Sequence, residues 1–175
     1  RAIKRGFRPG GLLQEDKLER MYDELEEPLK QRPKAILIES IEGAIDASGD
    51  ARAVILTGSR FSALRNVSTS NGDTGIELSS GDRNRLVRVA ASNHSINGIL
   101  LSSSGNNSLS DLSARNNDVC GVALDTAFLN TLTSVTVADN GTVPSPTGGG
   151  ACLNHAGRNR ISGVVATHNR NPRLW

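Results

Sequence analysis

The sequence has few aromatic residues, only two cysteines and no long apolar run. Five of its 175 residues are aromatic, so a core must be built from Leu, Ile, Val and Ala. Two cysteines are too few for a disulfide framework. No stretch is apolar over the roughly 18 residues that a membrane-spanning helix needs. The formal net charge of +2 predicts no strong attraction to nucleic acid or to a membrane surface.

What the sequence has instead is an internal repeat of roughly 23 residues between Ala53 and Asn169. Two asparagine series follow this interval: Asn71, Asn93, Asn116, Asn140 and Asn169, and Asn84, Asn107, Asn130 and Asn159. Apolar residues recur at the same interval, as in the columns Leu64, Leu86, Leu109, Leu132 and Ile161, and Val67, Val89, Leu112, Val135 and Val164. Registered columns of this kind are typical of stacked structural repeats.

The pattern inside one repeat predicts short strands. Apolar residues alternate with polar ones, as at Ile99 and Leu101, and turn-forming Asn, Gly and Ser separate the runs. One coil cannot bury its apolar face alone, whereas stacked coils pair their backbones and share a core. We therefore predict an all-β fold, a right-handed parallel β-helix of about five to six coils over residues 35–175, with three short strands per repeat. Asn is expected at left-handed corners and in amide ladders.

A degenerate coil is expected before the clear ones. Val54 and Leu56 lie 22 residues before Ile76 and Leu78. By the same interval Ile45 should stack on Val67, and an edge coil is expected to begin at Ile36 and Ile38.

The segments NGILLSSSGNNSLSDLSARNN and CGVALDTAFLNTLTSVTVADN resemble the repeats of pectate-lyase-like right-handed β-helix proteins. The resemblance covers about two thirds of the chain. It implies the fold, and an extracellular or cell-surface protein that binds or cleaves a polysaccharide. The residues themselves argue against uronate lysis, because no acidic column suits a metal and no Lys follows Lys34. We expect neither a metal nor another cofactor.

Residues 1–34 differ from the rest in composition. A basic start is followed by Leu18, Met21, Tyr22, Leu25 and Leu29 at helical spacing. We predict a basic arm and an amphipathic helix that caps the first coil, since an open β-helix end exposes its core and strand edges. The alternative is a helix that docks on a partner.

Three charged residues form the first candidate site. By the repeat, Arg115, Asp139 and His168 should be neighbours on successive coils, beside a Pro- and Gly-rich insertion at 141–150. Neighbours about 5 Å apart can form salt bridges or perform acid–base chemistry. We consider these three residues as catalytic candidates. The alternative is a surface ladder of alternating charges.

A second candidate site would bind carbohydrate. Asp125 falls in a column with Ser79, Ser102 and Asn154, His155 follows that column, and Phe128 lies between Gly105 and Gly157. The Phe128 ring could stack on a sugar or simply cover the turn. Cys120 and Cys152 lie on consecutive coils with an offset of three residues, so no disulfide is expected.

Two classes of function remain open. We favour a non-catalytic structural or assembly subunit, because the candidate acid–base residues are few and the aromatics sparse. The segment after Asn169 is too short for a capping helix, so Ile161 and Val164 should face water unless Leu174 and Trp175 fold back over them. Otherwise other protein subunits, or residues absent from this chain, would supply the missing surface, and we expect this end to be an assembly or truncation surface. The alternative is a protein that binds or cleaves a polysaccharide.

Overall fold

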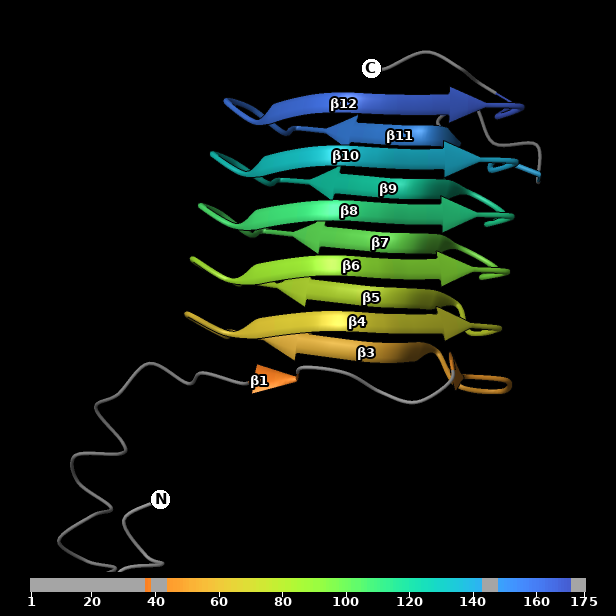
Figure 1. The fold of residues 1–175 in the computed structure, drawn as a ribbon, viewed down its shortest axis with the longest axis horizontal. Coiled ribbons are helices and arrows are strands. Elements are labelled where there is room, and N and C mark those ends of the chain that lie inside the picture. The colour runs from red at the N-terminus through yellow and green to blue at the C-terminus, as the bar shows by residue number, and fades with distance from the viewer. Residues whose placement is uncertain (1–36, 39–43, 143–147, 171–175) are drawn as a thin grey trace, which may run out of the picture. The chain divides into compact units, whose positions relative to one another are not determined.

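A computed structural model describes residues 37–38, 44–142 and 148–170. They form a parallel β-solenoid whose strands stack in two sheets (Figure 1). The strands are β1 (Leu37–Ile38), β2 (Ala44–Asp46), β3 (Arg52–Thr57), β4 (Ala63–Ser70), β5 (Thr74–Ser79), β6 (Arg85–Ser92), β7 (Asn97–Ser102), β8 (Ser108–Arg115), β9 (Cys120–Asp125), β10 (Thr131–Ala138), β11 (Gly149–Asn154) and β12 (Arg160–Thr167). The predicted arm and capping helix at 1–34 lie outside the described residues.

Each coil contributes one strand to each sheet. The odd-numbered strands from β3 to β11 form a sheet of five, and β1, β4, β6, β8, β10 and β12 follow one another in the other sheet, where β2 also pairs with β4. The prediction of three strands per repeat is therefore wrong for the described coils. The long strand is continuous but contains one residue with positive φ, at Asn66, Arg88, Asp111, Ser134 and Gly163. That residue bends the strand, so its two halves resemble separate runs in the sequence.

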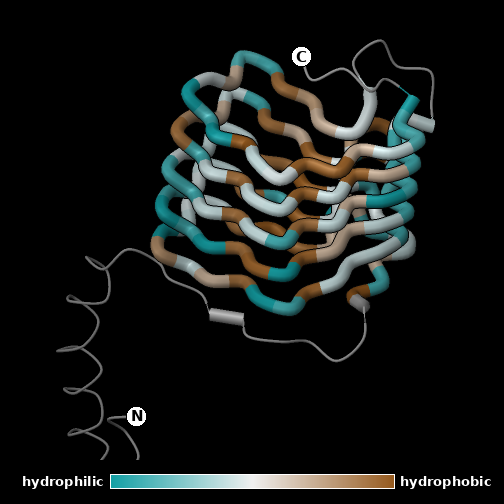
Figure 2. Tube along the Cα trace, turned by 45° about the horizontal axis from the view of Figure 1, so that its top comes forward, coloured by the Kyte–Doolittle hydropathy of each residue, from teal (hydrophilic) through white to brown (hydrophobic). Residues whose placement is uncertain are grey.

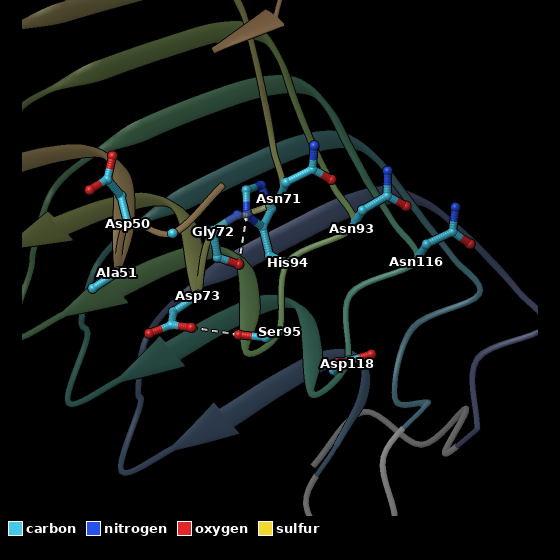
Figure 3. A pocket seen from close by; sticks show the side chains of 11 residues that line it. Asp50, Ala51, Asn71, Gly72, Asp73, Asn93, His94, Ser95, Asn116 and Asp118 are labelled. Atoms are coloured by element: carbon cyan, nitrogen blue, oxygen red, sulfur yellow. Dashed lines mark hydrogen bonds between the residues drawn. The ribbon is translucent and has the colours of Figure 1, made fainter. Parts of the chain in front are cut away.

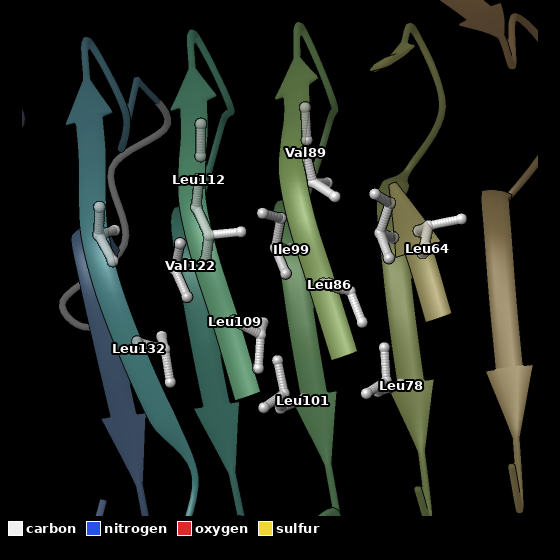
Figure 4. Close-up of a cluster of buried hydrophobic side chains, with 14 of the residues drawn as sticks. Leu64, Leu78, Leu86, Val89, Ile99, Leu101, Leu109, Leu112, Val122 and Leu132 are labelled. Carbon is white, nitrogen blue, oxygen red and sulfur yellow. The ribbon is translucent and has the colours of Figure 1, made fainter. Parts of the chain in front are cut away.

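The predicted apolar columns fill the interior. Leu112 pairs with Val89 and Val135, and Leu101 with Leu124. All five side chains are at most 2 % exposed, which confirms the predicted stack. Figure 4 shows how the aliphatic side chains of successive coils repeat the same position, and Figure 2 shows the resulting apolar bands.

The early coil is confirmed in part. Val54 pairs with Ile76 and Leu56 with Leu78, as the spacing predicts. Ile38 pairs with Leu64 at the edge. Ile45, however, pairs with Thr69 and not with Val67, because the turn between β2 and β3 is two residues longer than the turn between β4 and β5.

The insertion at 141–149 leaves the register intact. Gly149 pairs with Cys120, and Val164 still pairs with Val135. Residues 143–147 of the insertion lie outside the described residues. Figure 1 shows β11 and β12 continuing the stack on the far side of the insertion.

Candidate functional site

Two buried ladders of polar side chains run along the stack. The first consists of Asn84, Asn107, Asn130 and Asn159. Asn130 shows the repeating pattern: its Oδ1 accepts from the Asn107 backbone N–H at 2.9 Å and from the Asn107 Nδ2 at 3.0 Å. Its Nδ2 donates to the Ser104 carbonyl at 3.0 Å and to the Asn159 Oδ1 at 3.1 Å. Each interior amide thus satisfies backbone groups at a corner and links two coils.

The second ladder corrects one predicted column. It consists of His94, Asn117, Asn140 and Asn169, joined by the same bonds. The predicted series through Asn71, Asn93 and Asn116 does not continue to Asn140. These three residues are exposed, have positive φ, and continue as Asp139 and His168. The interval of 24 residues between Asn116 and Asn140 concealed a shift of one position.

His94 occupies an asparagine position and is 1 % exposed. Its Nδ1 accepts from the Gly72 N–H at 3.1 Å, and its Nε2 lies 3.1 Å from the Thr69 hydroxyl. The same Nδ1 also lies 3.3 Å from the Gly72 carbonyl oxygen. Burial lowers the pKa of His94, and the contacts with Gly72 and Thr69 offset part of that effect. His94 is therefore the first member of the second ladder, where it accepts from Gly72 on one side and donates its backbone N–H to Asn117 on the other.

The first candidate site is only partly assembled. His168 Nδ1 lies 3.7 Å from Asp139 Oδ1, so the predicted adjacency of these two residues is confirmed. Arg115 is one position off their column, since it pairs with Ala138 and Ser92, and its Nε donates to Ser113 Oγ at 3.3 Å. The His168 side chain is 83 % exposed and that of Asp139 51 %. Such exposure matches a solvated surface pair, and the catalytic role stays a prediction.

The second candidate site lies on the column expected for it. Asp125 pairs with Ser102 and Asn154, and its Oδ1 accepts from the Asn154 Nδ2 at 2.8 Å. His155 is exposed at the next corner. Phe128 pairs with Gly105 and Gly157, and a methyl group placed on Gly157 would lie 3.3 Å from the ring. The ring therefore covers this glycine while remaining 44 % exposed.

A polar groove of about 520 Å³ follows the corner that precedes the odd-numbered strands. Asn71, Asn93 and Asn116 project from its rim at equivalent positions on successive coils (Figure 3). Asp73 and Asp118 also line it, and the Ser95 hydroxyl donates to Asp73 at 2.6 Å. The groove offers amide and carboxylate groups at the spacing of the coils. It contains no described aromatic side chain.

Cys120 and Cys152 form a disulfide with a Cα–Cα distance of 6.2 Å, inside the usual range. The prediction against a disulfide is therefore wrong. Cys152 pairs with Ala123, so the bridge crosses diagonally between β9 and β11. The two Cα atoms lie 6.2 Å apart although the cysteines are offset by three residues in the register, so the strands are not fully extended between these positions. An extrapolation that assumes extended strands overestimates the separation of the two cysteines.

The last described coil differs from the interior ones. Its inward side chains Leu153, Ile161 and Val164 are only partly buried, whereas their equivalents one coil earlier are at most 2 % exposed. Both ladders also stop here. The Asn159 Nδ2 donates to the Ala127 carbonyl and the Asn169 Nδ2 to the Val137 carbonyl. No described residue accepts from the backbone N–H of Asn159 or Asn169, or from the second amide hydrogen of either side chain.

The described residues hold no group of three or more His, Cys, Asp or Glu side chains suited to a metal ion. Within the same ranges, no helix is long and apolar enough to cross a membrane. The sequence pattern indicated neither His94 as a ladder residue nor the donors left at Asn159 and Asn169. The ten-residue interval between the two ladders, as from Asn130 to Asn140, was the available signal.

The family model for the right-handed β-helix region matches residues 38–173. The chain therefore belongs to the right-handed β-helix family. Comparison with curated proteins and with solved structures gives no match.

Proposed function

We propose that this protein is a non-catalytic structural module that assembles with other polypeptides through the coil formed by β11 and β12. The open end of that coil is the observation that carries the proposal. Half-buried Leu153, Ile161 and Val164 lie there beside two strand edges without a described neighbour. Exposed core and free strand edges favour association with another chain.

The chemistry of the surface supports a role without catalysis. Asp139 and His168 are well exposed, so neither has the desolvated setting that acid–base catalysts use. Arg115 does not join them. The described β-helix provides instead a stack of coils whose strands pair position by position.

The disulfide supports an extracellular or cell-surface location. Disulfides such as Cys120–Cys152 persist in oxidising compartments and are rare in the cytosol. A structural module exposed outside the cell would gain from a covalent link between β9 and β11. Localisation of the tagged full chain by cell fractionation tests this part of the proposal.

Sedimentation velocity of two variants tests assembly. Val164 points into the open end, and Val165 points outward and is 54 % exposed. Val164→Lys should abolish self-association or association with a partner, because the ammonium group cannot be buried without a counter-charge. Val165→Lys is the matched control and should assemble like the parent. Equal behaviour of the two variants, or a parent that stays monomeric with every partner tried, would refute assembly through this end.

The groove favours polysaccharide binding as a second candidate. Asn71, Asn93 and Asn116 present amides about 4.8 Å apart along the stack, a spacing that could follow successive sugar units. Asp73 and Asp118 would repel acidic chains, so a neutral glycan fits better. Binding to a glycan array that Asn93→Ala weakens and Asn106→Ala does not would support this function. An activity screen on the same glycans separates binding from cleavage.

A further inference from the structure

The two ends of the asparagine ladders differ in chemistry. At the first described coil the ladders finish on backbone groups that have acceptors. Ser62 donates its N–H to the Asn84 Oδ1 at 2.9 Å, and Gly72 donates its N–H to His94. At the other end Asn159 and Asn169 keep donors that every interior ladder residue uses. The open end therefore lacks acceptor oxygens at two defined points.

We propose that this end binds a polypeptide segment that adds as a further parallel coil and carries two asparagines ten residues apart. The proposal rests on the assembly function above and specifies its partner. Asn159 and Asn169 are ten residues apart, as are Asn107 and Asn117. Only a segment with the same interval brings an Oδ1 to both sets of donors while its strand pairs with β12.

Interior coils show what each partner asparagine would contact. The Asn130 Oδ1 accepts two hydrogen bonds from Asn107, and its Nδ2 reaches the Ser104 carbonyl one coil back. By the same geometry, the first partner asparagine accepts from the N–H and Nδ2 of Asn159. The second partner asparagine does the same at Asn169. Each asparagine thus supplies three hydrogen bonds across the junction.

The open core defines the apolar residues of the partner. In the interior coil that starts at Asn107, Leu109 and Leu112 fill the core two and five residues after the asparagine. The partner needs apolar side chains at these two positions to cover Ile161 and Val164. The segment therefore has a single register in which both the amides and the apolar side chains match.

Charge further restricts the partner. Arg158, Arg160 and Arg170 are exposed on the last described coil, and no Asp or Glu follows Asp139 in the sequence. Earlier coils balance such charges, as where Arg60 lies 3.4 Å from Asp82 on the next coil. An acidic residue just after the first partner asparagine would face Arg160. The preferred partner is therefore an acidic coil of the same repeat type.

A synthetic peptide of residues 104–118 of this chain is the probe. It carries Asn107 and Asn117, and Leu109 and Leu112 between them. Binding to the full chain is measured by fluorescence anisotropy and by shifts of the Asn159 and Asn169 amide resonances. A peptide with Asn107→Ala and Asn117→Ala should bind at least about tenfold more weakly, because up to six hydrogen bonds are lost. The matched control, Ser108→Ala with Ser110→Ala, changes outward groups and should bind within about twofold of the parent.

A charge variant of the peptide tests the acidic preference. Ser108→Asp should bind a few-fold more tightly at low salt, and this gain should vanish at high salt. The proposal is overturned if the alanine peptide binds as well as the parent peptide, or if no peptide shifts the two amides at millimolar concentration. If Val164→Lys loses assembly while the parent and alanine peptides bind equally well, the requirement for two asparagines is refuted and the assembly function still stands. If the peptides bind as predicted but the protein never assembles, only the assembly function is refuted.

Discussion

Removing one ladder asparagine should destabilise the protein far more than removing its neighbour on the strand. Asn130 is 1 % exposed, and its side chain takes part in four hydrogen bonds. Asn130→Ala leaves the Asn107 N–H and one Asn107 amide hydrogen buried without a partner, whereas the Ser104 carbonyl still accepts from the Phe128 N–H. A buried unsatisfied group costs about 1–3 kcal/mol, so the two groups predict a loss of about 2–6 kcal/mol in the free energy of unfolding.

Urea unfolding followed by circular dichroism measures this loss. The midpoint should fall while the slope stays constant, because the exposed area changes little. Thr131→Ala is the control: it lies next along the chain, points outward, and should cost less than about 1 kcal/mol. If the two variants differ by less than about 1 kcal/mol, the ladder does not stabilise the stack as argued.

Three further changes test the core, the disulfide and the buried histidine. Leu112→Ala should cost about 2–5 kcal/mol in urea unfolding, as for other buried leucines, and a cost below that range would contradict the tight stack. Cys120→Ser with Cys152→Ser should cost about 3–4 kcal/mol, from a loop whose ends are 32 residues apart, and should make the melting temperature insensitive to reductant. Because burial lowers the pKa of folded His94 below its ordinary value near 6.5, its contribution to stability is complete above about pH 6.5 and is lost as the pH falls from there toward the folded pKa. His94→Asn should make the free energy of unfolding in urea nearly independent of pH across that window, whereas His155→Asn, at an exposed position, should leave the pH dependence unchanged. If the pH dependence persists in His94→Asn, it belongs to another group.

The core could be predicted because stacked coils place equivalent core residues at a nearly constant interval along the sequence. Leu112 must lie on Val89 and Val135, so any change in the length of a coil has to occur at a corner or in a loop. The insertion at 141–149 follows this rule, since Val164 still pairs with Val135. Equal spacing along the chain therefore determined which residues share a column wherever the interval stayed constant.

The sites could not be predicted as well, because they depend on shifts of one position. Arg115 and Asp139 differ by 24 residues instead of 23, and this single residue moves the guanidinium out of the His168 column. Only backbone pairing distinguishes such neighbours. Because of the same shift, Asn140 was assigned to the exposed corner series that contains Asn116, whereas it belongs to the buried ladder that begins at His94.

The disulfide and the insertion together explain how an open coil can keep its register. A terminal coil of a solenoid packs on one neighbour only, so it is the coil most prone to fray. The last described coil also follows the insertion at 141–149, which lengthens the repeat from 23 to 29 residues. Cys120 precedes the insertion and Cys152 follows it, so the bond ties the two strands together across it. Asn159, Asn169 and the half-buried Val164 are thereby held in the positions that a following coil would require, and the entropy of ordering this edge is lost before any partner binds.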